Sequence, residues 1–118
     1  MSENKDQKNE SHGSRMHVVI EQFFPKDGKT DEIIKIAKES AKGIYGVRGL
    51  LLAQVLSPKS KKGPVCNVTT WQSEEDFNAF MKSDAVKELY KSDMMKNVQN
   101  WSSDINVNMF QLEDGWHQ

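Results

Sequence analysis

The order in which strand-like and helix-like segments follow one another constrains this 118-residue chain more than any other feature. Strands favour β-branched and aromatic residues, whereas amphipathic helices carry apolar residues at spacings of three and four. The first pattern marks four segments, which are residues 16–24, 50–56, 65–71 and 105–112. The second pattern marks residues 30–44 and a region after residue 73 that restarts at Ser83. The predicted order is therefore β-α-β-β-α-β.

This order is that of the ferredoxin-like split βαβ arrangement. It predicts an α+β fold in which one antiparallel sheet carries its helices on one face. Turn residues predict a hairpin tip over residues 57–64, and residues 100–104 are expected to form a loop before the last strand. Trp101 and Trp116 then stand in polar stretches, where packing across a dimer would explain them.

Both faces of the predicted sheet carry apolar side chains. In the first strand Val19 and Phe23 alternate with Val18, Ile20 and Phe24. The two faces of the second strand are Leu50, Leu52 and Leu56, and Leu51, Ala53 and Val55. Helices can cover only one face, and a face in contact with water would alternate to polar residues. We therefore expect a homodimer through the uncovered face, with a monomer that exposes scattered apolar residues as the alternative.

Charge and composition argue against several kinds of partner. The 16 basic and 17 acidic residues give a net charge of -1, without the basic excess that nucleic-acid binding requires. No apolar run approaches the roughly 18 residues of a membrane span. The three histidines and one cysteine show no zinc-binding spacing, so no metal site is expected. The single Cys66 allows no internal disulfide and fits the reducing cytoplasm, where we expect the protein to act.

A chain of this length has room for one domain with one core. Residues 1–15 contain no apolar residue after the initiator methionine, so we expect them to be a disordered tail or a cloning remnant. We expect residues 16–113 to form the domain and residues 114–118 a C-terminal tail.

Polar residues of the third strand are the first candidates for a site. Asn67, Thr69 and Trp71 are two residues apart and therefore share one face of the strand. A buried amide needs a hydrogen-bond partner, so Asn67 contacts either a ligand or a neighbouring loop. Trp71 is either a cover for the core or an N–H donor to a ligand. The helical residues expected to line a cavity beside this strand are Phe77, Phe80, Tyr90 and Met94.

Four stretches resemble a known family. They are Asp27-Gly28-Lys29, Gly46-Val47-Arg48-Gly49-Leu50, Trp71-Gln72-Ser73-Glu74-Glu75-Asp76-Phe77 and Ser83-Asp84. Over about residues 16–113 the chain resembles the antibiotic biosynthesis monooxygenase (ABM) domain of the dimeric α+β barrel superfamily. This resemblance implies a ferredoxin-like fold that pairs into a dimeric α+β barrel. The superfamily hosts many chemistries, so the resemblance alone does not fix a reaction.

One branch of the family oxidises quinols or anthrones with O2 and without a cofactor. Its members have an asparagine four residues before the third-strand tryptophan, as Asn67 and Trp71 are placed here. The resemblance implies that Asn67 holds a phenolic or enolate oxygen while the Trp71 indole donates to developing charge. This chain departs from the pattern in having Phe77 where the family has tyrosine, and Lys91 where an arginine is expected.

A second branch degrades haem and needs a histidine ligand, a tryptophan and an asparagine. By spacing, these positions fall on Tyr90, on Phe80, and on Gln22 or a neighbour, so all three residue types are missing. Tyrosine can nevertheless ligate haem iron. Haem binding through Tyr90 is therefore a third hypothesis.

The sequence thus favours a cofactor-independent monooxygenase that acts on a small electron-rich aromatic molecule. Asn67 and Trp71 are the expected catalytic residues. The expected substrate-binding residues are Gln22, Thr69, Phe77, Phe80, Tyr90 and Met94. For the family's first-strand polar position, Glu21 is the alternative to Gln22.

The alternative is a non-catalytic small-ligand-binding or stress-response dimer of the same fold, which the missing tyrosine hydroxyl at Phe77 favours. An enzyme needs polar groups that converge in the cavity. A mere scaffold would fill that space with Phe77, Phe80 and Met81.

Overall fold

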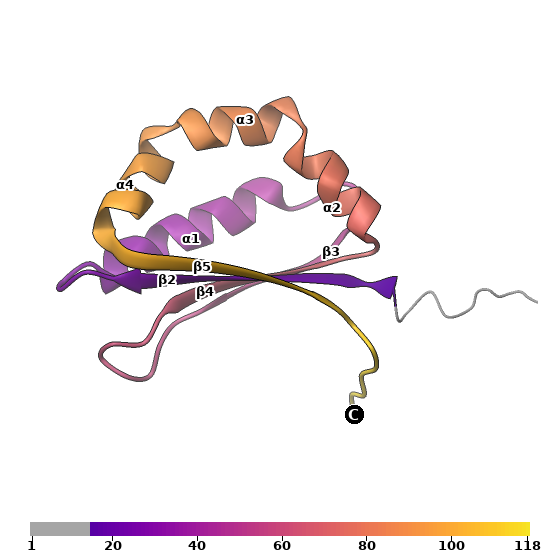
Figure 1. Ribbon diagram of the computed structural model, residues 1–118, viewed down its shortest axis with the longest axis horizontal. Helices are drawn as coiled ribbons and strands as arrows, with labels where there is room; N and C mark the ends of the chain where they lie inside the picture. Colours follow the sequence, from indigo (N-terminus) through magenta and orange to yellow (C-terminus); the bar gives the residue numbers. More distant parts are fainter. Residues whose placement is uncertain (1–14) are drawn as a thin grey trace, which may run out of the picture.

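The computed structural model describes residues 15–118, so the expected tail of residues 1–15 lies, apart from Arg15, outside the described residues. Figure 1 labels the helices and strands, and its labels are used below. Their bounds are β2 His17–Pro25, α1 Thr30–Ile44, β3 Leu50–Leu56, β4 Val65–Trp71, α2 Glu74–Met81, α3 Asp84–Lys91, α4 Asp93–Trp101 and β5 Ser102–Gln111. None of the described helices is long and apolar enough to cross a bilayer.

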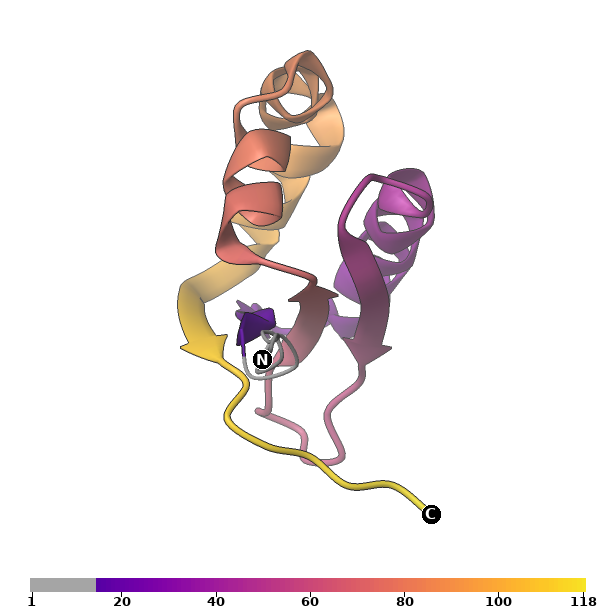
Figure 2. The ribbon, with the colours of Figure 1, turned by 90° about the vertical axis from the view of Figure 1, so that its right-hand side faces the viewer.

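The strands form one sheet in the order β3-β4-β2-β5, and each neighbouring pair is antiparallel. The α1 crossover therefore joins two strands that β4 separates, as the ferredoxin-like arrangement requires. The helices lie on one side of this sheet, with α1 in one column and α2–α4 in the other (Figure 2). The α+β, ferredoxin-like prediction is confirmed.

The register of the two central strands decides which side chains face the helices. His17, Val19, Glu21 and Phe23 pair with Trp71, Thr69, Asn67 and Val65, respectively. Cross-strand partners project to the same side of a sheet. Because Val19, Phe23, Val65 and Trp71 are buried in the core, the whole set faces the helices, Glu21 and Asn67 included.

The core beneath the helices is divided into two clusters. One cluster gathers at the β2–α1 end and consists of Phe23, Ile33, Ala37, Val65 and Val98. The other gathers where β4 runs into α2 and consists of Val19, Trp71 and Phe77, with Leu50, Phe80 and Met81 packed against it. Along β2 and β4, Glu21 and Asn67 fall between the residues of the two clusters.

Helices α2, α3 and α4 form an arch over the sheet (Figure 1). Each begins at a serine whose hydroxyl accepts a backbone N–H, at Ser73, Ser83 and Ser92. Ser83 and Ser92 also donate to the carbonyls of Phe80 and Leu89, which closes the preceding helix. A serine can thus end one helix and start the next at a single position.

The prediction of a loop over residues 100–104 is wrong. The Ser92 cap starts a third helix, which runs through Trp101 directly into β5 at Ser102. Trp101 packs against the first core cluster, and the Lys29 ammonium lies 4.8 Å from its ring centre. Trp101 therefore serves the core of its own chain, whereas Trp116 is exposed in the tail.

The β3–β4 pairing shifts register between Leu50 and Leu52. A bulge of this kind inserts one residue and changes the face of everything beyond it. Leu50 consequently packs against the Trp71 cluster, while Leu52 pairs with Thr70 on the other side of the sheet. The expectation that Leu50 and Leu52 share a face is corrected by this bulge.

The sheet face away from the helices carries apolar side chains on every strand, beside polar ones such as Gln22, Asn106 and Asn108. Its side chains include half-buried Val18, Ile20 and Val68 and the more exposed Leu52, Leu56 and Phe110. No described helix covers this face (Figure 1). We call it the open face.

The link between α1 and β3 offers a test of close packing with an internal control. Gly46 and Gly49 both have positive φ, at 91° and 85°. A Cβ atom at Gly49 would come within 2.7 Å of the Asp76 carboxylate. A Cβ atom at Gly46 would meet nothing within 4 Å. Gly46→Ala should lower the free energy of unfolding by about 1–2 kcal/mol through backbone strain alone. Gly49→Ala should cost about 1–3 kcal/mol more, because Asp76 in the first turn of α2 must move.

Urea denaturation of both variants measures these losses. If both variants lose the same free energy of unfolding, Asp76 moves aside without destabilising the fold, and the prediction is wrong.

Candidate functional site

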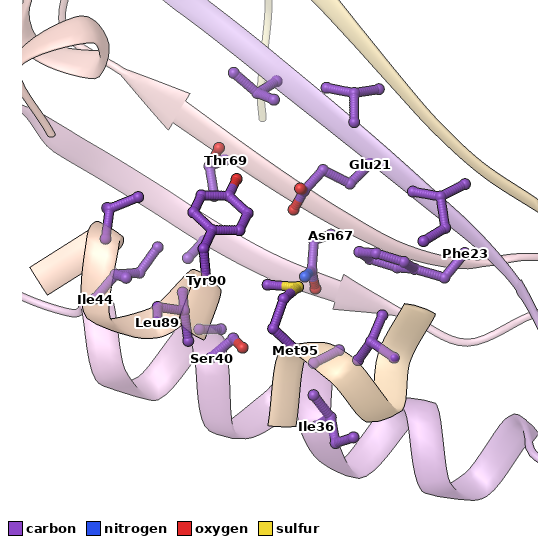
Figure 3. Close-up of a pocket in the computed structure, with 18 of the residues that line it drawn as sticks. Glu21, Phe23, Ile36, Ser40, Ile44, Asn67, Thr69, Leu89, Tyr90 and Met95 are labelled. Carbon is purple, nitrogen blue, oxygen red and sulfur yellow. The ribbon is translucent and has the colours of Figure 1, made fainter. Parts of the chain in front are cut away.

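A cavity of about 270 Å³ lies between the sheet and the helices. Its walls come from strands β2, β3, β4 and β5, from α1 on one side and from the α2–α4 arch on the other (Figure 3). Residues of both core clusters bound it. The walls are mainly apolar, which is typical of small-molecule sites with a few placed polar groups. The polar side chains of greatest interest are Glu21, Asn67, Thr69 and Tyr90.

Glu21 and Asn67 form the polar centre of the cavity floor. They face each other across the β2–β4 pair, and both side chains point from the sheet toward the helices (Figure 3). The Asn67 side chain hydrogen-bonds to Glu21, so the amide N–H donates to the carboxylate. The Asn67 Oδ1 atom is buried, and no donor among the described residues reaches it.

The environment of Glu21 changes its acidity. Burial raises the pKa of Glu21 above its ordinary value of 4.5, and the hydrogen bond from Asn67 offsets part of that rise. Among the described residues that line the cavity, no lysine, arginine or histidine balances the carboxylate. A carboxyl whose pKa rises for this reason takes up a proton more readily than a solvated glutamate.

Tyr90 faces this pair from the arch. Its hydroxyl end points from α3 toward the sheet, while half of the side chain remains exposed (Figure 3). Burial of the hydroxyl end raises the pKa of Tyr90 above 10.0, and the negative charge of Glu21 raises it further. Tyr90 is therefore kept as a neutral phenol, which can donate one hydrogen bond into the cavity.

Trp71 lies at the end of the cavity and is only 1% exposed. Its indole N–H donates to Thr69 Oγ1 at 3.0 Å, and its ring centre lies 5.5 Å from Phe77 and 5.2 Å from Phe80. The Trp71 donor is thus already used within the chain. In this arrangement Trp71 forms a wall and holds Thr69, rather than offering its N–H to a ligand.

Most residues expected from the sequence do meet at the cavity. Its lining includes Asn67, Thr69, Trp71, Phe77, Phe80, Tyr90 and Met94. Gln22 does not line it, because it pairs with Cys66 and Asn106 on the open face. The substrate-binding expectation for Gln22 is therefore corrected in favour of its neighbour Glu21.

The strand alternation already contained the signal for Glu21, since it lies two residues from both Val19 and Phe23. Sequence reasoning missed the α1 wall, which contributes Ile36, Ser40 and Ile44, and it missed Met95 of α4. These residues come from helices distant in the chain. No local pattern indicates which helical face will line a cavity and which will fill a core.

His17 is only 8% exposed, and its ring centre lies 5.1 Å from that of Phe77. Its Nε2 atom has no hydrogen-bond partner among the described residues. Within residues 15–118, no three His, Cys, Asp or Glu side chains gather as a metal site would require. Cys66 is half-buried and lies on the open face, opposite to Asn67.

Comparison with family models places this fold and cavity in a known group. The model for antibiotic biosynthesis monooxygenases matches residues 16–92. The chain belongs to the ABM family. A comparison with curated proteins found no match.

Solved structures share the ABM fold at low identity. A candidate antibiotic biosynthesis monooxygenase from Deinococcus radiodurans superposes with a TM-score of 0.69 at 10% identity, covering 86% of this chain and 97% of that one. A conserved protein from Methanosarcina mazei gives 0.69 at 14% identity, covering 85% and 95%. The haem degrader MhuD from Mycobacterium tuberculosis, solved with two haems in its active site, gives 0.69 at 20%, covering 86% and 99%. At these identities the likeness concerns the fold.

The residues of this ABM cavity fit haem poorly. The described histidines are His17, which is buried against Phe77 and does not line the cavity, and His117 in the tail. Tyr90 could approach an iron, but its raised pKa disfavours the phenolate that binds iron. The uncompensated Glu21 carboxylate would also oppose the propionates of a haem.

The raised pKa of Glu21 has a consequence for stability. The folded state holds the Glu21 proton more tightly than the unfolded state, so stability falls as pH rises from about 4.5 through the folded pKa, and is constant above it. Glu21→Gln removes this loss. The variant should therefore gain stability relative to wild type as the pH rises through that window, and the gain should vanish below it.

Urea denaturation from about pH 4 to about pH 8 measures this difference. Glu39→Gln, at an exposed position of α1, controls for the loss of a carboxylate. A Glu21→Gln curve parallel to wild type over the whole range would contradict the prediction.

Proposed function

We propose that this protein is a monooxygenase that oxidises a small, electron-rich phenolic molecule with O2 and without a cofactor. The observation that carries the proposal is the Glu21 carboxylate, placed without a counter-ion in an apolar cavity beside Asn67. Retaining a buried carboxylate costs stability, and such groups are concentrated at functional sites.

In the proposed first step, Glu21 acts as a general base and removes a hydroxyl proton from the substrate. A carboxyl with a raised pKa is better matched to this task near neutral pH. The Asn67 N–H steadies the carboxylate, and the neutral Tyr90 hydroxyl donates toward the substrate or the reduced oxygen. The resulting electron-rich anion is the reductant for O2.

The reaction balances without an outside reductant. A hydroquinone that becomes a hydroxyquinone loses four electrons, and O2 gains four. One oxygen atom forms the new bond to a ring carbon, whose C–H bond breaks. The other oxygen leaves as water, and two substrate hydrogens leave with it. Neither a flavin nor a metal is required for this stoichiometry.

Asn67 and Trp71 keep different roles in this proposal. Asn67 contacts the substrate or the base directly, so it is a catalytic residue. Trp71 is a positioning residue, since its N–H is held by Thr69 and its ring supports Phe77 and Phe80. Thr69, Phe77, Phe80 and Met94 form the substrate-binding walls.

The second candidate is a non-catalytic, small-ligand-binding or stress-response dimer. Phe77 without a hydroxyl and the occupied Trp71 N–H favour it. A scaffold would, however, let Phe77, Phe80 and Met81 fill the space, whereas a cavity of about 270 Å³ stands open between Glu21 and the arch. The convergence of Glu21, Asn67 and Tyr90 supports the enzyme over the scaffold.

We further propose that the protein is a homodimer that joins two open faces. Leu52, Leu56 and Phe110 are 48%, 48% and 49% exposed there, and an apolar patch on every strand of one face is typical of an interface. Pairing two sheets in this way leaves each cavity within its own subunit. A reducing cytoplasmic setting would keep the Cys66 thiol on this face unpaired.

The enzyme proposal predicts oxygen uptake that depends on Glu21. Metal-stripped protein should consume O2 with quinols, catechols or anthrones faster than their autoxidation. Glu21→Gln should lower the rate by about 10²- to 10⁴-fold, the usual contribution of a general base, and Asn67→Ala should lower it as well. Wild-type activity should rise as the pH passes upward through the raised pKa of Glu21.

Gln22→Ala is the matched control, because Gln22 is adjacent in the strand but faces away from the cavity. Its rate should equal that of wild type. Uptake no faster than autoxidation across the panel would favour the ligand-binding candidate. Uptake that Glu21→Gln leaves intact would remove Glu21 from the mechanism.

The dimer proposal predicts that a charge on the open face dissociates the subunits. Leu52→Glu should shift the mass in solution from dimer to monomer, because a buried unpaired carboxylate at an interface is strongly unfavourable. Tyr45→Glu is the control, since Tyr45 is 87% exposed between α1 and β3. Light scattering after size-exclusion chromatography measures both masses. A wild-type monomer would refute the proposal.

A further inference from the structure

The floor of the cavity offers hydrogen-bond acceptors but few donors. One of the two Asn67 amide N–H groups donates to Glu21, and Asn67 Oδ1 is buried with no donor among the described residues. The Trp71 N–H is used by Thr69 Oγ1. The floor therefore presents the carboxylate of Glu21 and the amide oxygen of Asn67 as two acceptors.

These two acceptors lie side by side. Glu21 and Asn67 are direct cross-strand partners, and the side chains of such partners start only about 4.5–5.5 Å apart. The hydrogen bond between them brings the carboxylate and the amide closer still. A ligand that satisfies both must carry two donors on neighbouring atoms.

A buried acceptor without a hydrogen bond raises the free energy of the folded protein. A ligand that donates a hydrogen bond to it removes this penalty and therefore binds more tightly. The remaining walls favour a flat apolar ring, since Phe23, Leu89 and Met95 surround the pair (Figure 3) and thioethers contact aromatic rings well. No lysine or arginine lines the cavity among the described residues. An anionic ring substituent beside the Glu21–Asn67 pair would meet two acceptors and no positive charge, with only the hydroxyls of Thr69 and Tyr90 nearby as donors.

We infer that the Glu21–Asn67 pair selects aromatic rings with two adjacent hydrogen-bond donors, as in a catechol or an ortho-aminophenol. One hydroxyl donates to the Glu21 carboxylate and is the one that loses its proton, while its neighbour donates to Asn67 Oδ1. A para-quinol has its hydroxyls at opposite ends of the ring and engages the pair with one. The inference rests on the proposed function, because it assumes that a phenol binds in this cavity.

Binding without O2 tests this selectivity apart from turnover. Catechol, guaiacol and hydroquinone are titrated anaerobically into the full-length protein, and their Kd values are measured by NMR chemical-shift changes. Guaiacol keeps both ring oxygens of catechol but carries a methyl group in place of one hydroxyl hydrogen, so it is slightly larger and lacks one donor. Catechol should bind about tenfold more tightly than guaiacol or hydroquinone, because it makes one more hydrogen bond to a buried acceptor.

Asn67→Val keeps a strand-forming side chain but removes the acceptor, and it should reduce the preference for catechol over guaiacol to within about twofold. Gln22→Ala, on the other face of β2, should retain the full preference. Each variant is titrated with both ligands. A folding defect would weaken the binding of both and leave the ratio of their Kd values unchanged, whereas loss of the acceptor changes that ratio. Wild-type protein that binds catechol no more tightly than guaiacol overturns the inference.

The two proposals fail in different ways. A clear catechol preference without any catalysed oxygen uptake overturns the monooxygenase and supports the ligand class. Catalysed uptake with anthrones or para-quinols but no catechol preference overturns the ligand class and supports the monooxygenase.

Discussion

The burial of Trp71 is the interaction on which the remaining structure depends. The indole is almost completely enclosed, donates to Thr69 and packs against Phe77 and Phe80. This contact fixes the start of the arch at one end of the sheet. At the other end of the arch, Trp101 packs on the first core cluster and holds the end of α4 against the sheet. Because the arch is held at both ends, the middle of the sheet remains uncovered by core side chains, and the cavity forms there.

The sequence predicts the elements whose signals are local. Alternation in the strands, the helical stripe of α1 and the caps at Ser73 and Ser83 lead to the correct fold. The same alternation places Asn67, Thr69 and Trp71 on one wall. It also contains the choice of Glu21 over Gln22, because only the former shares a face with Val19 and Phe23.

Other features depend on contacts between distant segments. The β3 bulge arises from its pairing with β4, and no turn residue marks it. The break between α3 and α4 escaped prediction because Leu89, Tyr90 and Met94 keep the apolar spacing of one continuous helix across Ser92. The bond between Trp71 and Thr69 is a matter of side-chain orientation, which spacing along the chain does not determine. These are the features that decide which donors and acceptors remain available in the cavity.

In this fold, the polar pair of the cavity and the roof that covers it belong to different elements. The roof helices meet at serine junctions. Glu21 and Asn67 stand on paired strands, where hydrogen bonds across the sheet fix their position. The roof above them consists of three short helices, joined at Ser83 and Ser92 without any intervening loop. A helical turn could be added, removed or replaced at either serine while Glu21 and Asn67 on the strands stay in place. Changes in the roof helices would therefore alter which ligands the cavity admits, and would replace Tyr90 where they include α3, while Glu21 and Asn67 keep their positions.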